Sequence, residues 1–168
     1  MKNLFKKIAI LSIALFVIGC SKDDEPTAPA EVVKTKVKIT GYKIENFPFV
    51  TSGGLGWDGI GGLPDVFVGL FNGTTLVYAS NTVNNFPQSG LPLSASFVSP
   101  YYLVPSFSNT INIVVMDNDQ NDTPSNADDE IGYVPFIMSD YTTGTNKYPQ
   151  TVTKTANGVT ATLLLTWE

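Results

Sequence analysis

The feature that most constrains this chain is a series of short runs of β-branched and aromatic residues, each bounded by Gly, Pro, Asn or Asp. No stretch has a convincing helical period, and runs of this kind indicate the strands of a sandwich or barrel. The eight runs are residues 33–44, 66–71, 75–79, 94–98, 111–116, 131–137, 151–155 and 160–167. We therefore expect an all-β fold.

Two dipeptides predict tight hairpins between neighbouring runs. Asn72-Gly73 separates the second and third runs, and Asn157-Gly158 separates the last two. Asn and Gly both tolerate positive φ, which the two-residue turns of β-hairpins require. We expect antiparallel pairing across both turns.

The first nineteen residues are arranged like a secretory signal peptide. Basic residues, including Lys6 and Lys7, precede an apolar run over residues 8–18 and the small residue Gly19. This order is typical of a cleaved signal. The run is also shorter than the roughly 20 residues that a transmembrane helix needs. We expect cleavage before Cys20.

The sequence Val17-Ile18-Gly19-Cys20 resembles the lipobox of bacterial lipoproteins, in which the cysteine is acylated, for example with palmitate. Cys20 is the only cysteine and so has no disulfide partner. The acidic stretch 21–25 resembles the tether of Bacteroidetes-type lipoproteins on the outer face of the outer membrane. The resemblance implies a surface-exposed, lipid-anchored protein of the outer membrane. Its segments are a signal peptide (1–19), lipidated Cys20 with a flexible tether (20–31), and one folded domain (32–168).

Acidic residues gather in the middle of the chain without basic neighbours. Between Lys43 and Lys147 there is no Lys, Arg or His but there are ten acids, six of them within residues 117–130. Clustered carboxylates repel one another unless they are solvated, protonated or bridged by a cation. Asp117 and Asp119 directly follow an apolar run, which positions them together at a sheet edge. A hard cation with oxygen ligands, Ca²⁺ above all, fits this pattern. A solvated acidic loop that binds no ion is the alternative.

Two segments resemble the calcium loops of C2 domains. In the first, residues 57–68, an Asp leads through a glycine-rich turn to a second Asp and an apolar strand; in the second, residues 114–132, Asp-Asn-Asp follows an apolar strand and the segment closes on Asp-Glu-Ile-Gly. The resemblance implies an eight-stranded antiparallel Greek-key β-sandwich with Ca²⁺ at one end. The implied ligands are the carboxylates of Asp58, Asp65, Asp117, Asp119 and Asp129 and the backbone carbonyl of Asn118, with Asp122 or Asp128 as alternatives to Asp129.

The C2 resemblance implies a calcium-dependent module that binds membranes or proteins. Leu55, Trp57 and Ile60 of the first loop are the expected contacts with phospholipid. A surface carbohydrate-binding module with structural calcium is the alternative. In that case aromatic side chains would form a row across a sheet face, and the candidates are Trp57, Tyr101, Tyr102 and Tyr141.

The composition argues against two other classes of function. The chain has no His and no Arg, and its one Cys is assigned to lipid, so it lacks the usual general base, anion clamp and thiol nucleophile. We therefore do not expect an enzyme. The net charge of −5 argues against nucleic acid as a partner.

Overall fold

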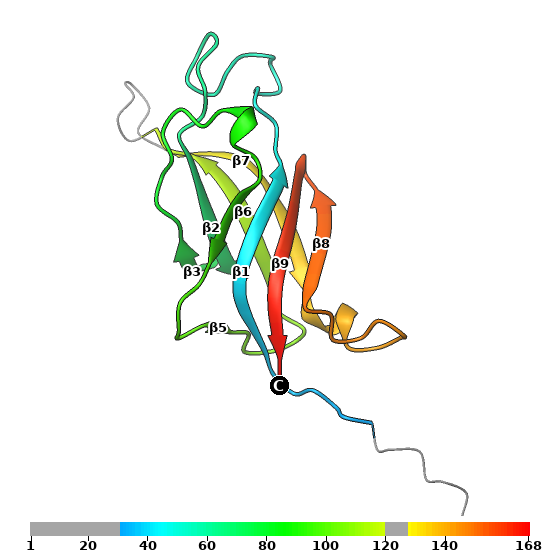
Figure 1. The fold of residues 1–168 in the computed structure, drawn as a ribbon. Helices are drawn as coiled ribbons and strands as arrows, with labels where there is room; N and C mark the ends of the chain where they lie inside the picture. Colours follow the sequence, from blue (N-terminus) through cyan, green and yellow to red (C-terminus); the bar gives the residue numbers. More distant parts are fainter. Residues whose placement is uncertain (1–30, 120–127) are drawn as a thin grey trace, which may run out of the picture. The chain divides into compact units, whose positions relative to one another are not determined.

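Two antiparallel β-sheets pack face to face in the computed structural model, which describes residues 31–119 and 128–168 (Figure 1). One sheet has the strand order β4-β1-β9-β8, with β5 also paired to β1, and the other has the order β3-β2-β6-β7. The strands are β1 (Val37–Asn46), β2 (Val66–Asn72), β3 (Thr75–Ala79), β4 (Leu93–Ser96), β5 (Tyr102–Leu103), β6 (Thr110–Asp117), β7 (Asp129–Ile137), β8 (Thr151–Ala156) and β9 (Val159–Trp167). The 3₁₀ turns η1 (Gln88–Gly90) and η2 (Met138–Tyr141) lie between strands.

The connectivity is that of a Greek-key sandwich. The chain passes from one sheet to the other after β1, β3, β5 and β7, so that β1 lies beside β9 and β2 beside β6. The predicted all-β sandwich is confirmed. The predicted strand number of eight is corrected to nine within the described part of the chain. The additional strand, β5, pairs only at Lys38 and Ile39 of β1, a contact too short to leave a pattern in the sequence.

Both predicted hairpins form. Ala156 pairs with Val159, and the two residues between them, Asn157 and Gly158, have φ of 46° and 79°. This is the backbone that a tight hairpin turn requires. Between β2 and β3 the turn residues are 73 and 74, one position later than the dipeptide suggested.

The first strand is shorter than predicted and changes phase along its length. The run 33–44 becomes a strand only from Val37. Val37 and Ile39 face the core, but the next large core side chain is that of Tyr42, three positions on. A bulge between Ile39 and Gly41 causes this shift, because one extra residue moves every later side chain to the other face.

A single cluster of buried side chains from both sheets forms the core. Among the largest are Tyr42, Phe47, Phe136 and Leu163, all essentially inaccessible to solvent. Burying each such side chain contributes about 1.5–3 kcal/mol. No helix among residues 31–119 and 128–168 is long and apolar enough to cross a membrane.

Candidate metal centre

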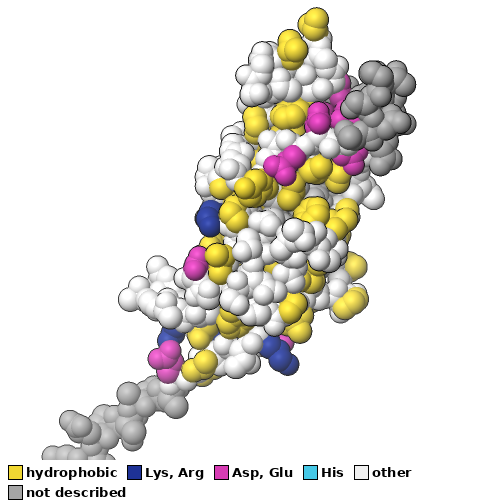
Figure 2. Space-filling model, turned by 180° about the vertical axis from the view of Figure 1, so that it is seen from behind, with side chains coloured by type: hydrophobic (Ala, Val, Ile, Leu, Met, Phe, Trp, Pro, Cys, Tyr) yellow, Lys and Arg dark blue, Asp and Glu magenta, His cyan; other side chains and the backbone are white. Residues whose placement is uncertain are grey.

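Strand pairing brings the two predicted loops to one end of the sandwich. Val66, at the start of β2, pairs with Asp117 at the end of β6, and Asp117 pairs with Asp129 at the start of β7. The loop of residues 47–65 joins the end of β1 to the start of β2 and so lies at this same end. Acidic side chains gather there in Figure 2. Acids that are far apart in the sequence therefore become neighbours.

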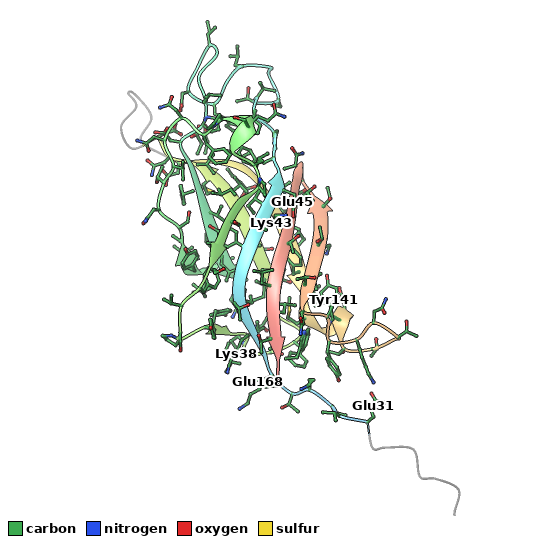
Figure 3. All side chains as sticks on the ribbon, viewed as in Figure 1. Glu31, Lys38, Lys43, Glu45, Tyr141 and Glu168 are labelled. Carbon is green, nitrogen blue, oxygen red and sulfur yellow. The ribbon has the colours of Figure 1, made fainter. Side chains whose placement is uncertain are left out.

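The two lysine ion pairs among the described residues involve glutamates and none of the aspartates. Lys38, near the start of β1, donates a hydrogen bond of 2.6 Å from Nζ to Oε1 of Glu168 (Figure 3), and this bond holds the pKa of Glu168 below its usual range. Lys43 pairs with Glu45 at 2.8 Å. The next basic residue in the sequence is Lys147.

Asp58, Asp117 and Asp119 form the centre of the acidic end. Each places one carboxylate oxygen within 4.8 Å of the other two. Asp117 is 0% exposed and Asp119 only 8% exposed. The pKa of Asp117 is raised to about 6, first because burial removes its charge from water and then because the charges of Asp58, Asp119 and Asp65 lie close by.

The two oxygens of Asp117 have different surroundings. Oδ1 accepts a hydrogen bond of 2.6 Å from the backbone N–H of Asp65. Oδ2 is buried and has no hydrogen-bond partner among the residues that the structure describes. A buried carboxylate oxygen without a partner is costly. A cation with oxygen ligands would supply that partner, so the residues present fit a hard divalent ion.

A glycine-rich turn folds closely over Asp58. A Cβ atom on Gly62 would lie 2.6 Å from the Cβ of Asp58, so only glycine permits this approach. Gly59 and Gly61 have φ of 88° and 78°, the left-handed region that favours glycine. The glycines that define the first loop in the sequence therefore let its turn close over Asp58, whose carboxylate lies near that of Asp117 at the end of β6.

The apolar residues of the same loop divide into a packed set and a projecting set. Phe47 is 1% exposed and stacks on Phe49 at 4.4 Å between ring centroids. Trp57 is partly buried and donates from Nε1 to the carbonyl of Pro48 at 2.9 Å. Leu55 and Ile60, in contrast, are 54% and 96% exposed. Of the three predicted membrane contacts, Leu55 and Ile60 therefore project from the loop into solvent, whereas Trp57 is hydrogen-bonded within it.

Asp65 and Asn118 connect the end of β6 to the segment of residues 82–85. Oδ1 of Asp65 accepts from the backbone N–H of Asn85 at 2.6 Å, and Nδ2 of Asn118 donates to Oγ1 of Thr82 at 3.2 Å. Asp65 is outside the group of three, and its assignment as a ligand, like that of the Asn118 carbonyl, stays a prediction. Little in the sequence marks this segment except the Asn84-Asn85 pair, since Asn is common in turns.

The remaining predicted ligands differ in their environment. Asp129 pairs with Asp117 across the strands, but it is exposed and does not join the group of three. Asp128 is partly buried, and within the described ranges its Oδ1 is a buried oxygen without a hydrogen-bond partner. Asp128 is therefore the better placed of the two. Asp122 and Cys20 lie outside the described residues.

The four aromatic residues of the carbohydrate alternative do not form a row. Trp57 belongs to the loop at the acidic end. Tyr102 lies in β5, which pairs with the start of β1, and Tyr101 directly precedes it. Tyr141 (Figure 3) lies in η2, after the far end of β7. Tyr101 and Tyr102 therefore lie together, apart from Trp57 and Tyr141, and the four residues do not form one row.

Comparison with known proteins finds a likeness in fold. No family model matches the chain, and no curated protein matches it. A solved structure described as "Structure of a C2 domain" is similar, with a TM-score of 0.43 and 12% sequence identity, and the alignment covers 79% of this chain and 97% of that one. The likeness concerns the arrangement of strands and says nothing of ligands or activity.

Proposed function

We propose that the domain binds Ca²⁺ through Asp58, Asp117 and Asp119 and that the bound ion attaches it to an anionic phospholipid surface. The observation that carries this proposal is Oδ2 of Asp117, a buried oxygen with no hydrogen-bond partner in the described chain, on a residue grouped with two further carboxylates. Three carboxylates at this spacing repel one another. A divalent cation between them converts that repulsion into coordination.

The donor set suits Ca²⁺ better than Mg²⁺. Ca²⁺ takes six to eight oxygen ligands in flexible geometry, whereas Mg²⁺ demands an octahedron and retains its waters. The three carboxylates cannot fill a calcium shell alone. The carbonyl of Asn118 and the carboxylates of Asp65 or Asp128 are the further donors that we propose. Positions that the protein leaves open are available to phosphate oxygens of a lipid.

Attraction to an anionic membrane would have to come from the ion. No basic residue lies between Lys43 and Lys147, so the acidic end by itself repels phosphate. The bound ion would locally replace this repulsion of phosphate by attraction. Leu55 and Ile60 flank Asp58 in the sequence of the same loop and expose apolar surface. Inserting such a side chain into lipid contributes up to about 1.5–3 kcal/mol.

The same proposal places the domain outside the cytoplasm, on a protein anchored in the outer membrane through lipid on Cys20. The lipobox-like residues and the acidic stretch after them support this placement. The domain then acts as a binding module, and we assign it no catalytic step.

Co-sedimentation with vesicles tests the membrane step. We expect the protein to bind phosphatidylglycerol–phosphatidylcholine vesicles in Ca²⁺ and not in EGTA. The double variant Leu55→Ser, Ile60→Ser should lose vesicle binding and keep its calcium affinity. Leu76→Ser is the matched control, because Leu76 on β3 is 52% exposed, close to the 54% of Leu55, and lies outside the loop. Calcium binding without vesicle binding would contradict the membrane step alone, and absence of calcium binding would contradict the whole proposal.

A further inference from the structure

A recess lies away from the carboxylates, between β3 of one sheet and the segment from β4 to β5 of the other. Its volume is about 550 Å³, within the range of small-molecule sites. Ser96 pairs with Gly41 and Tyr102 with Ile39, both in the first half of β1, whereas the carboxylates lie beyond the other end of β1. We name this recess the tyrosine groove; the aromatic and hydroxyl-bearing residues that line it are Tyr78, Ser96, Phe97, Ser99, Tyr101 and Tyr102.

We propose that the tyrosine groove binds a neutral carbohydrate, with a pyranose ring stacked on tyrosine. This site is separate from the calcium-binding function proposed above and does not depend on it.

Two of the rings that line the groove pack against the core. The rings of Tyr78 and Phe97 lie 4.4 Å apart between centroids, and Tyr42 contacts both, at 6.3 Å from Tyr78 and 5.9 Å from Phe97. Tyr42 is only 2% exposed. Two of the groove's rings are therefore anchored to a buried residue, so a ligand would find them already ordered. Tyr101, at 41% exposure, leaves much of its side chain open to solvent.

The hydroxyl content favours a sugar over an aliphatic ligand. Five of the ten lining residues carry a hydroxyl group, and the others are mainly apolar. An aliphatic ligand would remove these hydroxyls from water without giving them partners, which is unfavourable. A pyranose presents an apolar C–H face to an aromatic ring, and its own hydroxyls donate and accept around its edge. It therefore matches both parts of the lining.

The charge of the lining favours a neutral sugar. None of the residues that line the groove, in the part of the chain that the structure describes, is acidic or basic. A carboxylate, sulfate or phosphate on the ligand would lose its water without gaining an ion pair. An uncharged oligosaccharide has no such penalty.

Isothermal titration calorimetry on the full chain in dodecylphosphocholine micelles tests the proposal. The titrants are maltohexaose, cellohexaose and xylohexaose, in EGTA so that a calcium site plays no part. We expect binding of at least one of them. Tyr101→Ala should weaken that binding about tenfold, the effect of losing one aromatic stacking contact, and Tyr101→Phe should retain it. Tyr133→Ala is the matched control, since Tyr133 lies in β7 of the other sheet and is 37% exposed.

Three outcomes would overturn the proposal: no heat with any of the three oligosaccharides at millimolar concentration, Tyr101→Ala binding as tightly as the unmodified protein, or equal loss in Tyr133→Ala. A titration with polygalacturonate adds a fourth, because binding of this charged polymer alone would contradict the neutral lining. Thermal melting of each variant checks that it folds. An unchanged melting temperature in Tyr101→Ala shows that any loss of binding is local.

Discussion

Replacing Asp117 by Asn should change the stability of the domain in opposite directions with and without calcium. In EGTA the variant should be more stable, because at neutral pH the carboxylate of Asp117 is ionised while buried beside Asp58 and Asp119. The asparagine oxygen can still accept the hydrogen bond from the N–H of Asp65, and its NH₂ group would take the place of Oδ2. That group can donate to the neighbouring carboxylates. One repulsive charge is removed and one unsatisfied acceptor becomes a donor.

With calcium present the unmodified protein should be more stable than Asp117→Asn. An ion that binds the folded state at a concentration 100-fold above its Kd stabilises that state by about 2.7 kcal/mol. For a domain of this size each kcal/mol raises the melting temperature by roughly 3–5 °C, so the unmodified protein should gain about 10 °C. Extracellular calcium modules have Kd values of about 10⁻⁴–10⁻³ M, which sets the concentrations to use. Asp117→Asn loses a charged ligand and should gain little.

Melting curves followed by circular dichroism, in EGTA and over a calcium series, measure both effects. Asp140→Asn is the matched control, because it removes the same charge from an exposed position in η2. The control should melt and respond to calcium like the unmodified protein. If Asp117→Asn were destabilised in EGTA and still gained the full 10 °C or so in calcium, Asp117 would be a structural residue and not a ligand.

The remaining predictions concern pH, packing and the anchor. Burial raises the pKa of Asp117 from 3.8 to about 6, so its contribution to calcium-free stability is fully present below about pH 3.8 and is lost as the pH rises through 6. The melting temperature in EGTA should therefore be higher at pH 5 than at pH 7, and this difference should shrink in Asp117→Asn. The affinity for calcium should fall at pH 5. Gly41→Ala should cost about 1–3 kcal/mol in urea unfolding, because the new Cβ would lie 2.5 Å from the carbonyl oxygen of Ala95, whereas Gly53→Ala meets nothing closer than 3.7 Å and should be nearly silent. Cys20→Ser should abolish labelling with a radioactive fatty acid and release the protein from membranes, and a variant that still labels would refute the anchor.

Most strand positions could be predicted from the sequence because the side chains themselves carry the signal. The run 75–79 coincides with β3, and the run 66–71 is one residue shorter than β2. Alternation of apolar and polar residues, interrupted by turn formers, is a local property that needs no knowledge of the partner strand. β5 lacks that property, since its two residues form a strand only because the start of β1 lies beside them.

Near bulges, the face of the sheet to which each side chain points could not be predicted. A bulge depends on how many residues the partner strand contributes, which the sequence of one strand does not contain. This applies to the three consecutive acids Asp128, Asp129 and Glu130, of which the last two begin β7. The register shifts between Val115 and Met116 of β6, next to the point where Asp129 pairs with Asp117. The sequence identifies this acidic segment as a source of ligands, but it does not determine which of its carboxylates turns inward.

The three grouped carboxylates show which part of a site can be predicted in this way. Asp117 and Asp119 follow directly from a buried strand, and Asp58 lies in a glycine-rich turn, so each has a sequence signal of its own. The hydrogen bond from Asp65 to Asp117 has none, because it depends on the pairing of β2 with β6. That bond uses one oxygen of Asp117 to fix the start of β2, and the other oxygen is the one that we propose binds the cation. Under this proposal one carboxylate serves both purposes, so ion binding at this end should be coupled to the order of the strand ends that form it.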